Sequence, residues 1–192
     1  MATVVLLGGV ALAASGIGKE TAFAFAQAGS KGVVFADINE EGAQAAAEES
    51  SKLATHPSFR ATAVKVDITD EASVDNMVAA ALKEFGRIDY NVNSAGLGDI
   101  FGATTPNIKA DGFSRTIDTN IRGTMLCVRA VSQAMAAQEP LSYESRRSGA
   151  RSLGRGSIVN LGSVNSYIAP SGMMPYTASK HAIAGITKTA GT

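Results

Sequence analysis

The sequence is poor in the residues that build disulfides and metal sites. Cys127 is the only cysteine among 192 residues, which excludes an intrachain disulfide and a cysteine-rich metal centre. The two histidines, His56 and His181, offer little for a metal site, so we expect none. A single cysteine is typical of a reducing compartment, and the cytoplasm is the expected location.

Net charge and long apolar runs are also lacking. The 17 Lys and Arg residues balance 17 Asp and Glu residues, so we expect no nucleic-acid partner and no membrane partner. No run approaches the roughly 18 to 20 apolar residues that cross a bilayer. Residues 3–14 resemble a secretory leader in their apolar character, but no Lys or Arg precedes them, so a buried first strand is favoured. The 45% of hydrophobic residues indicates one globular domain over 1–192.

Short β-branched runs alternate with longer helical patterns along the chain. The expected strands cover 3–7, 33–35, 63–66, 88–92 and 157–161, and the expected helices cover 18–28, 40–53, 71–85 and 113–138. This alternation favours right-handed parallel crossovers. It predicts an α/β fold with a doubly wound, Rossmann-like parallel sheet in three layers, with a ligand beyond the carboxyl ends of the strands.

Residues 139–156 break the alternation. They carry four arginines among several Ser and Gly residues, which favours an exposed insertion loop over a basic binding patch.

A glycine pair stands where the first expected strand meets the first helix. In Ser15-Gly16-Ile17-Gly18, a missing Cβ lets a dinucleotide pyrophosphate approach backbone N–H groups at a helix N-terminus. Asp37 follows Gly18 by about 20 residues, the spacing of a carboxylate that binds the adenosine ribose. Such a carboxylate repels the 2′-phosphate of NADP, so NAD is the preferred cofactor and NADP the alternative. Taken singly, the glycines could form an ordinary turn, and Asp37 could be a turn residue after a strand.

Tyr176 and Lys180 lie one helical turn apart, so on a helix their side chains face the same way. A phenol is a poor base at neutral pH, but a neighbouring ammonium stabilises the phenolate and moves its pKa toward the working range. Ser163 could hold a substrate oxygen while Tyr176 exchanges a proton and a hydride moves to or from a nicotinamide. By itself, a Tyr-x-x-x-Lys pattern is usually structural.

Together these motifs resemble the short-chain dehydrogenase/reductase family of NAD(P)-dependent oxidoreductases, from the first strand almost to Thr192. The resemblance implies interconversion of a secondary alcohol and a ketone, and assembly as a homodimer or homotetramer. It implies a catalytic set of four residues: Asn120, Ser163, Tyr176 and Lys180, with Asn120 holding a water that links Lys180 to solvent. It implies cofactor contacts from Ser15, Gly16, Ile17 and Gly18 at the phosphates, Asp37 at the ribose, Asp67 and Ile68 beside the adenine, Asn93, Ala95 and Gly96 after the fourth strand, and Tyr176 and Lys180.

The chain departs from the family pattern in two places. Ala11 and Leu12 stand where the family has the Thr and first Gly of its Thr-Gly-x-x-x-Gly-Ile-Gly loop, which predicts a damaged or displaced turn. Either three residues are absent between Leu12 and Ala13, or Gly8 or Gly9 makes a longer turn. The sequence also ends at Thr192, where family members continue into a sixth strand, so we expect a C-terminally incomplete domain without the last strands. The alternative function is therefore a catalytically impaired remnant that acts only as a nucleotide-binding or subunit-association module.

Overall fold

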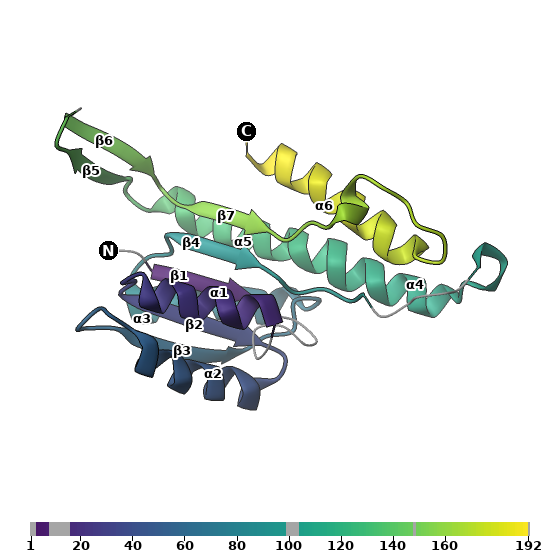
Figure 1. Ribbon diagram of the computed structural model, residues 1–192, viewed down its shortest axis with the longest axis horizontal. Helices are drawn as coiled ribbons and strands as arrows, with labels where there is room; N and C mark the ends of the chain where they lie inside the picture. Colours follow the sequence, from purple (N-terminus) through teal and green to yellow (C-terminus); the bar gives the residue numbers. More distant parts are fainter. Residues whose placement is uncertain (1–2, 8–15, 99–103, 148, 192) are drawn as a thin grey trace.

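A parallel sheet forms the centre of the computed structural model, which describes residues 16–98, 104–147 and 149–191 and the backbone of 3–7. The strands of this sheet are β1 (Thr3–Leu7), β2 (Gly32–Asp37), β3 (Arg60–Lys65), β4 (Tyr90–Asn93) and β7 (Ser157–Asn160). Their spatial order is β3-β2-β1-β4-β7, so the direction of winding reverses between β1 and β4 (Figure 1). Doubly wound folds bind their ligands at this switch point.

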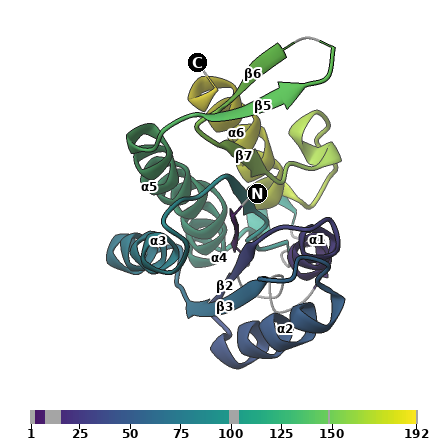
Figure 2. The same ribbon diagram turned by 90° about the vertical axis from the view of Figure 1, so that its left-hand side faces the viewer.

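Helices cover both faces of the sheet (Figure 2). The helices α1 (Gly16–Gln27) and α2 (Glu40–Leu53) pack on one face. On the other face lie α3 (Glu71–Phe85), α5 (Thr124–Ala137) and α6 (Met174–Ala190). The predicted three-layer α/β fold is confirmed, although β3 begins at Arg60 and not at the expected residue 63.

The strand β2 explains why the sequence has continuous apolar runs. Val34 and Ala36 belong to the core cluster that contains residues of α3 and α5. Val33 and Phe35 belong to the cluster under α1 and α2. Because helices cover the strand on both faces, every residue of β2 is buried and no polar alternation is needed.

The single helix expected over 113–138 is divided in the structure. It begins as α4 (Ala110–Ile117), widens into a π-helical turn over Asp118–Gly123, and continues as α5. At Gly123 a Cβ atom would lie 2.7 Å from Cδ1 of Ile68, so only glycine lets the turn lie against that side chain. The π turn contains Asn120, and such turns occur frequently at functional sites.

We expect Gly123→Ala to lower the free energy of unfolding by about 1–3 kcal/mol, because the new methyl group must displace Ile68 from a packed core. Urea unfolding followed by circular dichroism measures this change. Gly185→Ala in α6 is the matched control, since a Cβ there meets nothing within 4 Å. That control should be neutral or slightly stabilising, and equal effects of the two substitutions would contradict the packing argument.

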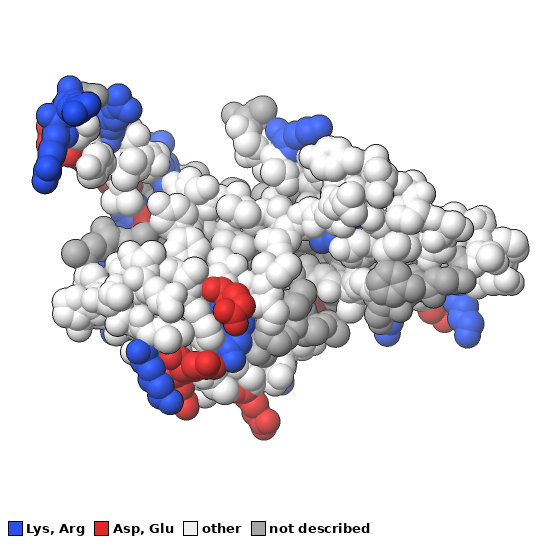
Figure 3. Space-filling view, in the orientation of Figure 1, with Lys and Arg blue, Asp and Glu red and all other residues white. Residues whose placement is uncertain are grey.

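Residues 139–156, which the sequence predicts to be an exposed insertion loop, contain a β-hairpin. Here β5 (Leu141–Ser145) and β6 (Gly149–Gly154) pair antiparallel, with Tyr143 opposite Arg151. The hairpin projects away from the sheet and carries arginine side chains near its tip (Figures 1 and 3). These two strands were not predicted because they contain Gly, Ala and Glu, which are depleted in strands, and few β-branched or aromatic residues. In the part of the chain that the structure describes, no helix is long and apolar enough to cross a bilayer.

Candidate active site

The polar residues singled out in the sequence gather beyond the carboxyl ends of the parallel strands. Asp37 is the last residue of β2, Asn93 is the last residue of β4, and Ser163 follows β7 closely. Carboxyl ends of parallel strands meet at one edge of a sheet. The helix α6 begins beside this edge and brings Tyr176 and Lys180 to it.

Lys180 and Tyr176 lie next to each other on α6. The Lys180 Nζ atom lies 5.6 Å from the centre of the Tyr176 ring and donates a hydrogen bond of 2.7 Å to the carbonyl oxygen of Leu161. Lys180 is only 7% exposed. Burial removes water from its ammonium group and lowers the pKa of Lys180 below its usual 10.5.

This lowered pKa makes the stability of the fold depend on pH. As the pH rises toward 10.5, the unfolded chain holds the Lys180 proton more tightly than the folded chain, so the contribution of Lys180 to the free energy of unfolding rises. We expect Lys180→Met to remove that rise. Urea unfolding of both proteins from neutral pH to about 10.5 measures it. A free-energy difference between the two proteins that does not change with pH would contradict the assignment.

Asn120 joins the chain after β4 to α6. Its Oδ1 accepts a hydrogen bond of 2.7 Å from the N–H of Leu97, and its Nδ2 donates to the Leu97 carbonyl and to Ser179 Oγ, each at 2.9 Å. Ser179 in turn donates to the carbonyl oxygen of Tyr176. A Cβ on Gly96 would lie 3.4 Å from Asn120 Oδ1 and 3.9 Å from Lys180 Nζ. The structure therefore places Asn120, Gly96 and Lys180 together.

Sequence reasoning missed the parts that Leu97 and Ser179 play in this network. Both are buried, and Ser179 lies within the segment from Tyr176 to Lys180 that the sequence analysis emphasised. A small polar residue on the inward side of a helix is the signal that was available for Ser179. The bonds of Leu97 involve only its backbone, so its side chain gave no signal.

Ser163 caps a short 3-10 helix over Val164–Ser166. Its Oγ accepts a hydrogen bond from the N–H of Asn165, and its own N–H donates to Ser166 Oγ. Ser166 Oγ donates to the carbonyl oxygen of Lys180 at 2.8 Å, which fastens the turn to α6. Because the bond from Asn165 uses a lone pair of Ser163 Oγ, the hydroxyl proton can still be donated to a ligand.

The residues expected to contact the phosphates and the adenosine ribose of the cofactor differ in burial and in hydrogen bonding. Gly16 opens α1 with φ of 62°, and Ile17 beside it is 58% exposed; Ser15, Ala11 and Leu12 lie outside the described residues. Asp37 is 1% exposed, and its Oδ1 accepts a hydrogen bond of 2.9 Å from the N–H of Asn39.

A cleft of about 790 Å³ lies between the ends of β2 and β3 and the helix α4, and Asp67 lines it. The side chain of Ile68 points into the core instead, where Gly123 packs against it. Ile38, which the sequence analysis did not single out, lines the cleft and is 41% exposed. An apolar residue directly after Asp37 is the sequence signal that could have identified it.

The side chain of Asn93 forms hydrogen bonds within the sheet. Its Nδ2 donates to Asn160 Oδ1 at 2.7 Å, and its Oδ1 accepts from Asn91 Nδ2 at 2.9 Å. This side chain therefore ties β4 to β7, and Ala95 beside it is also buried. Gly18 is buried at the start of α1.

Cys127 and His181 are assigned no chemical role at this site. Cys127 is buried in α5, and burial raises the pKa of its thiol to about 12, so it stays neutral. His181 lies on α6, where its Nδ1 is 3.0 Å from the carbonyl oxygen of Thr177. Among the described residues, no group of three His, Cys, Asp or Glu side chains is placed to hold a metal ion.

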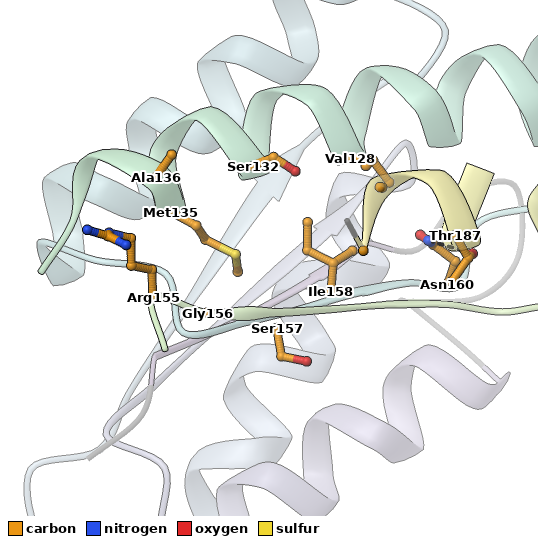
Figure 4. Close-up of a pocket in the computed structure, with 12 residues that line it drawn as sticks. Val128, Ser132, Met135, Ala136, Arg155, Gly156, Ser157, Ile158, Asn160 and Thr187 are labelled. Atoms are coloured by element: carbon orange, nitrogen blue, oxygen red, sulfur yellow. Dashed lines mark hydrogen bonds between the residues drawn. The ribbon is translucent and has the colours of Figure 1, made fainter. Parts of the chain in front are cut away.

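A separate hollow of about 380 Å³ lies between α5, β7 and the last turn of α6 (Figure 4). Met135 of α5 and Ile158 of β7 line it, together with Arg155 just before the start of the strand. This hollow runs along β7, from Arg155 before the strand to Asn160 at its end. None of the described residues proposed for the site lines it.

Comparison with known proteins supplies the family. The model of the short chain dehydrogenase family matches residues 3–192. The short-chain dehydrogenase anuF of Penicillium roqueforti is 46% identical over 187 residues, which cover 96% of this chain and 67% of that protein. The short-chain dehydrogenase srdC of Neurospora crassa is 45% identical over 93% of this chain and 65% of its own length. The chain spans about two thirds of the length of these relatives.

Solved structures agree with the sequence relatives. The crystal structure of NAD+-bound xylitol dehydrogenase has a TM-score of 0.81 and 28% identity, covering 98% of this chain and 63% of that one. Levodione reductase gives the same TM-score of 0.81 at 28% identity, over 98% of this chain and 64% of its own. The family match, the relatives and the parallel sheet lead to one conclusion: the chain belongs to the short-chain dehydrogenase family.

Proposed function

We propose that the chain is an NAD-dependent oxidoreductase that interconverts a secondary alcohol and a ketone. The observation that carries this proposal is the Lys180 ammonium, held 5.6 Å from the centre of the Tyr176 ring at the carboxyl edge of the sheet. Ser163 and Asn120 lie on segments bonded to the same helix. The whole arrangement suits proton exchange with a substrate oxygen.

The residues present fit a nicotinamide dinucleotide. Gly16 begins α1 in the left-handed region, so no Cβ blocks approach to the N–H groups of that helix end. Asp37 places a buried carboxylate at the end of β2, where it suits the hydroxyls of an adenosine ribose. Ile38 and Asp67 in the neighbouring cleft suit a flat base with polar edges. When bound, such a cofactor supplies a hydride acceptor or donor.

The residues of this chain handle the proton and the orientation of the substrate. Tyr176 takes the hydroxyl proton of the alcohol, or returns it to the carbonyl oxygen in the reverse direction. The Lys180 ammonium stabilises the resulting phenolate because an opposite charge nearby favours the ionised form. The Ser163 hydroxyl donates a hydrogen bond to the substrate oxygen and so fixes the position of that oxygen. Asn120 Nδ2 donates one hydrogen bond to the Leu97 carbonyl and one to Ser179 Oγ. Asn120 therefore positions α6 and does not contact the substrate.

The direct test is an absorbance assay at the reduced nicotinamide band, with NAD+ and a panel of secondary alcohols, preceded by a calorimetric titration of NAD+. Formation of reduced nicotinamide supports the proposal. Binding without turnover across the panel would instead identify a nucleotide-binding module.

Asp37→Ser tests the cofactor preference. We expect the affinity for NAD+ to fall about 10- to 100-fold, since hydrogen bonds to a charged group contribute about 1.5–3 kcal/mol. Discrimination against NADP+ should also weaken, because the carboxylate that repels its phosphate is gone. Calorimetric titration of both nucleotides measures these changes, with Asp75→Ser on the exposed side of α3 as the matched control. Unchanged affinities would remove Asp37 from the ribose site.

A further inference from the structure

The hairpin of β5 and β6 concentrates positive charge near its turn. Residues 139–156 contain four arginines and two glutamates, in a chain whose positive and negative residues balance. Arg146 and Arg147 lie in the turn, Arg151 lies in β6, and all three are exposed. Among the described residues, no salt bridge joins any of the three to a carboxylate. We call Arg146, Arg147 and Arg151 the basic tip.

The hairpin lacks the packing that stabilises the strands of the main sheet. β5 and β6 form a two-stranded sheet of their own, which projects from the rest of the molecule (Figure 1). Two paired strands are marginally stable in water unless another surface packs against them. Leu153 of β6 is 58% exposed, so the hairpin presents an apolar side chain together with its arginines. These features suit a hairpin that is covered by a partner carrying carboxylates.

Carboxylates gather on the outer side of α2. Glu40, Glu41 and Glu48 are exposed and line a hollow of about 480 Å³. Glu49 on the same helix is already paired with Lys19, at 2.7 Å. The helix dipole favours carboxylates in the first turn of a helix, which explains Glu40 and Glu41 but not Glu48. We call Glu40, Glu41 and Glu48 the acidic face.

The basic tip and the acidic face of one molecule lie at opposite edges of the sheet. The hairpin leads into β7 at one edge, and α2 packs beside β3 at the other. Figures 1 and 2 show the hairpin and α2 on opposite sides of the molecule, and Figure 3 shows blue side chains over the hairpin and red ones over α2. A contact between the two surfaces therefore needs a second copy of the chain.

We propose that the basic tip of one molecule docks on the acidic face of a second copy of this chain. A guanidinium group binds a carboxylate through two parallel hydrogen bonds, so arginines suit such a contact better than lysines. The contact joins two different surfaces, so each copy keeps one free tip or one free face, and association continues head to tail. It is thus distinct from the closed homodimer or homotetramer expected from the sequence. The inference is independent of the oxidoreductase proposal.

Sedimentation velocity at a series of protein concentrations tests the contact. The mass of the unsubstituted chain should rise with concentration at about 0.01 M NaCl and not at about 1 M, because the screening length falls from about 30 Å to about 3 Å. The tip variant carries Arg146→Gln, Arg147→Gln and Arg151→Gln. In this variant the dissociation constant at low salt should rise at least about tenfold.

A second variant removes the charge of the acidic face through Glu40→Gln, Glu41→Gln and Glu48→Gln. It should lose association as the tip variant does. An equimolar mixture of the two variants should regain it, because one retains the acidic face and the other retains the basic tip. The mixture should add one contact between unlike variants and then stop, since neither variant has both surfaces.

A charge-matched control carries Lys83→Gln, Lys109→Gln and Lys188→Gln, which removes three positive charges from other exposed positions. It should associate like the unsubstituted chain. Circular dichroism should show all variants folded, because every substituted side chain is exposed.

Three results would overturn the inference. The first is a mass that does not depend on concentration at low salt. The second is equal loss of association in the control and the tip variant, which would show a general effect of net charge. The third is a mixture that behaves like its two components, which would show that the tip and the acidic face do not bind each other.

Discussion

Tyr176→Phe should lower the turnover number about 10²- to 10⁴-fold, the usual contribution of a positioned acid or base. The substitution removes one oxygen atom from the group that exchanges the substrate proton and keeps the ring beside Lys180. Binding of NAD+ should be unaffected, because the ammonium and the cleft remain. Initial rates at the reduced nicotinamide band and a calorimetric NAD+ titration measure the two quantities separately.

Tyr143→Phe on the exposed hairpin provides the control for loss of a phenol elsewhere. It should leave both turnover and NAD+ affinity unchanged. If Tyr176→Phe retained the rate of the unsubstituted chain, Tyr176 would not be the acid or base. If it lost NAD+ binding as well as turnover, the phenol would act in binding and not in proton exchange.

Asn120→Ala should lower the free energy of unfolding by about 3 kcal/mol, because it leaves the buried N–H and carbonyl of Leu97 without partners and removes one of the hydrogen bonds of Ser179 Oγ. Asn120 is 1% exposed and makes three hydrogen bonds to these two residues. Because this part of the core is buried, water cannot easily replace the three lost hydrogen bonds. Urea unfolding monitored by circular dichroism measures the loss, and turnover should fall with it because α6 is no longer held to the chain after β4.

Two further variants separate the possible causes. Gln133→Ala on the exposed side of α5 should change the free energy of unfolding by less than about 0.5 kcal/mol. Asn120→Asp keeps an acceptor for the Leu97 N–H but cannot donate to the Leu97 carbonyl or to Ser179, so it should also be strongly destabilised. A cost for Asn120→Ala no larger than that of Gln133→Ala would show that the network contributes little to folding.

The sheet could be predicted because its pattern is local. In β2, apolar residues face helices on both sides, so the run of Val33, Val34 and Phe35 is visible without any knowledge of the fold. The Tyr176 and Lys180 pair was accessible for a similar reason, since helical geometry alone brings residues one turn apart together.

Features that depend on distant contacts could not be predicted. The π turn at Asn120 contains Gly123, which lies against Ile68 in the loop between β3 and α3, far away in the sequence. Ile68 lies in the core, whereas Ile38 lines the cleft. The hairpin of β5 and β6 was not predicted because its residues have weak strand preferences. Its strand pairing, such as Tyr143 with Arg151, follows from the register that the turn sets.

A crystal structure of the chain with oxidised nicotinamide dinucleotide tests the central claim most directly. The claim predicts the adenosine ribose on the Asp37 carboxylate and the nicotinamide ring beside the Tyr176 hydroxyl, with the Lys180 amine within hydrogen-bonding distance of the nicotinamide ribose. Density for the nucleotide in another cleft, or a nicotinamide ring turned away from both side chains, would contradict it.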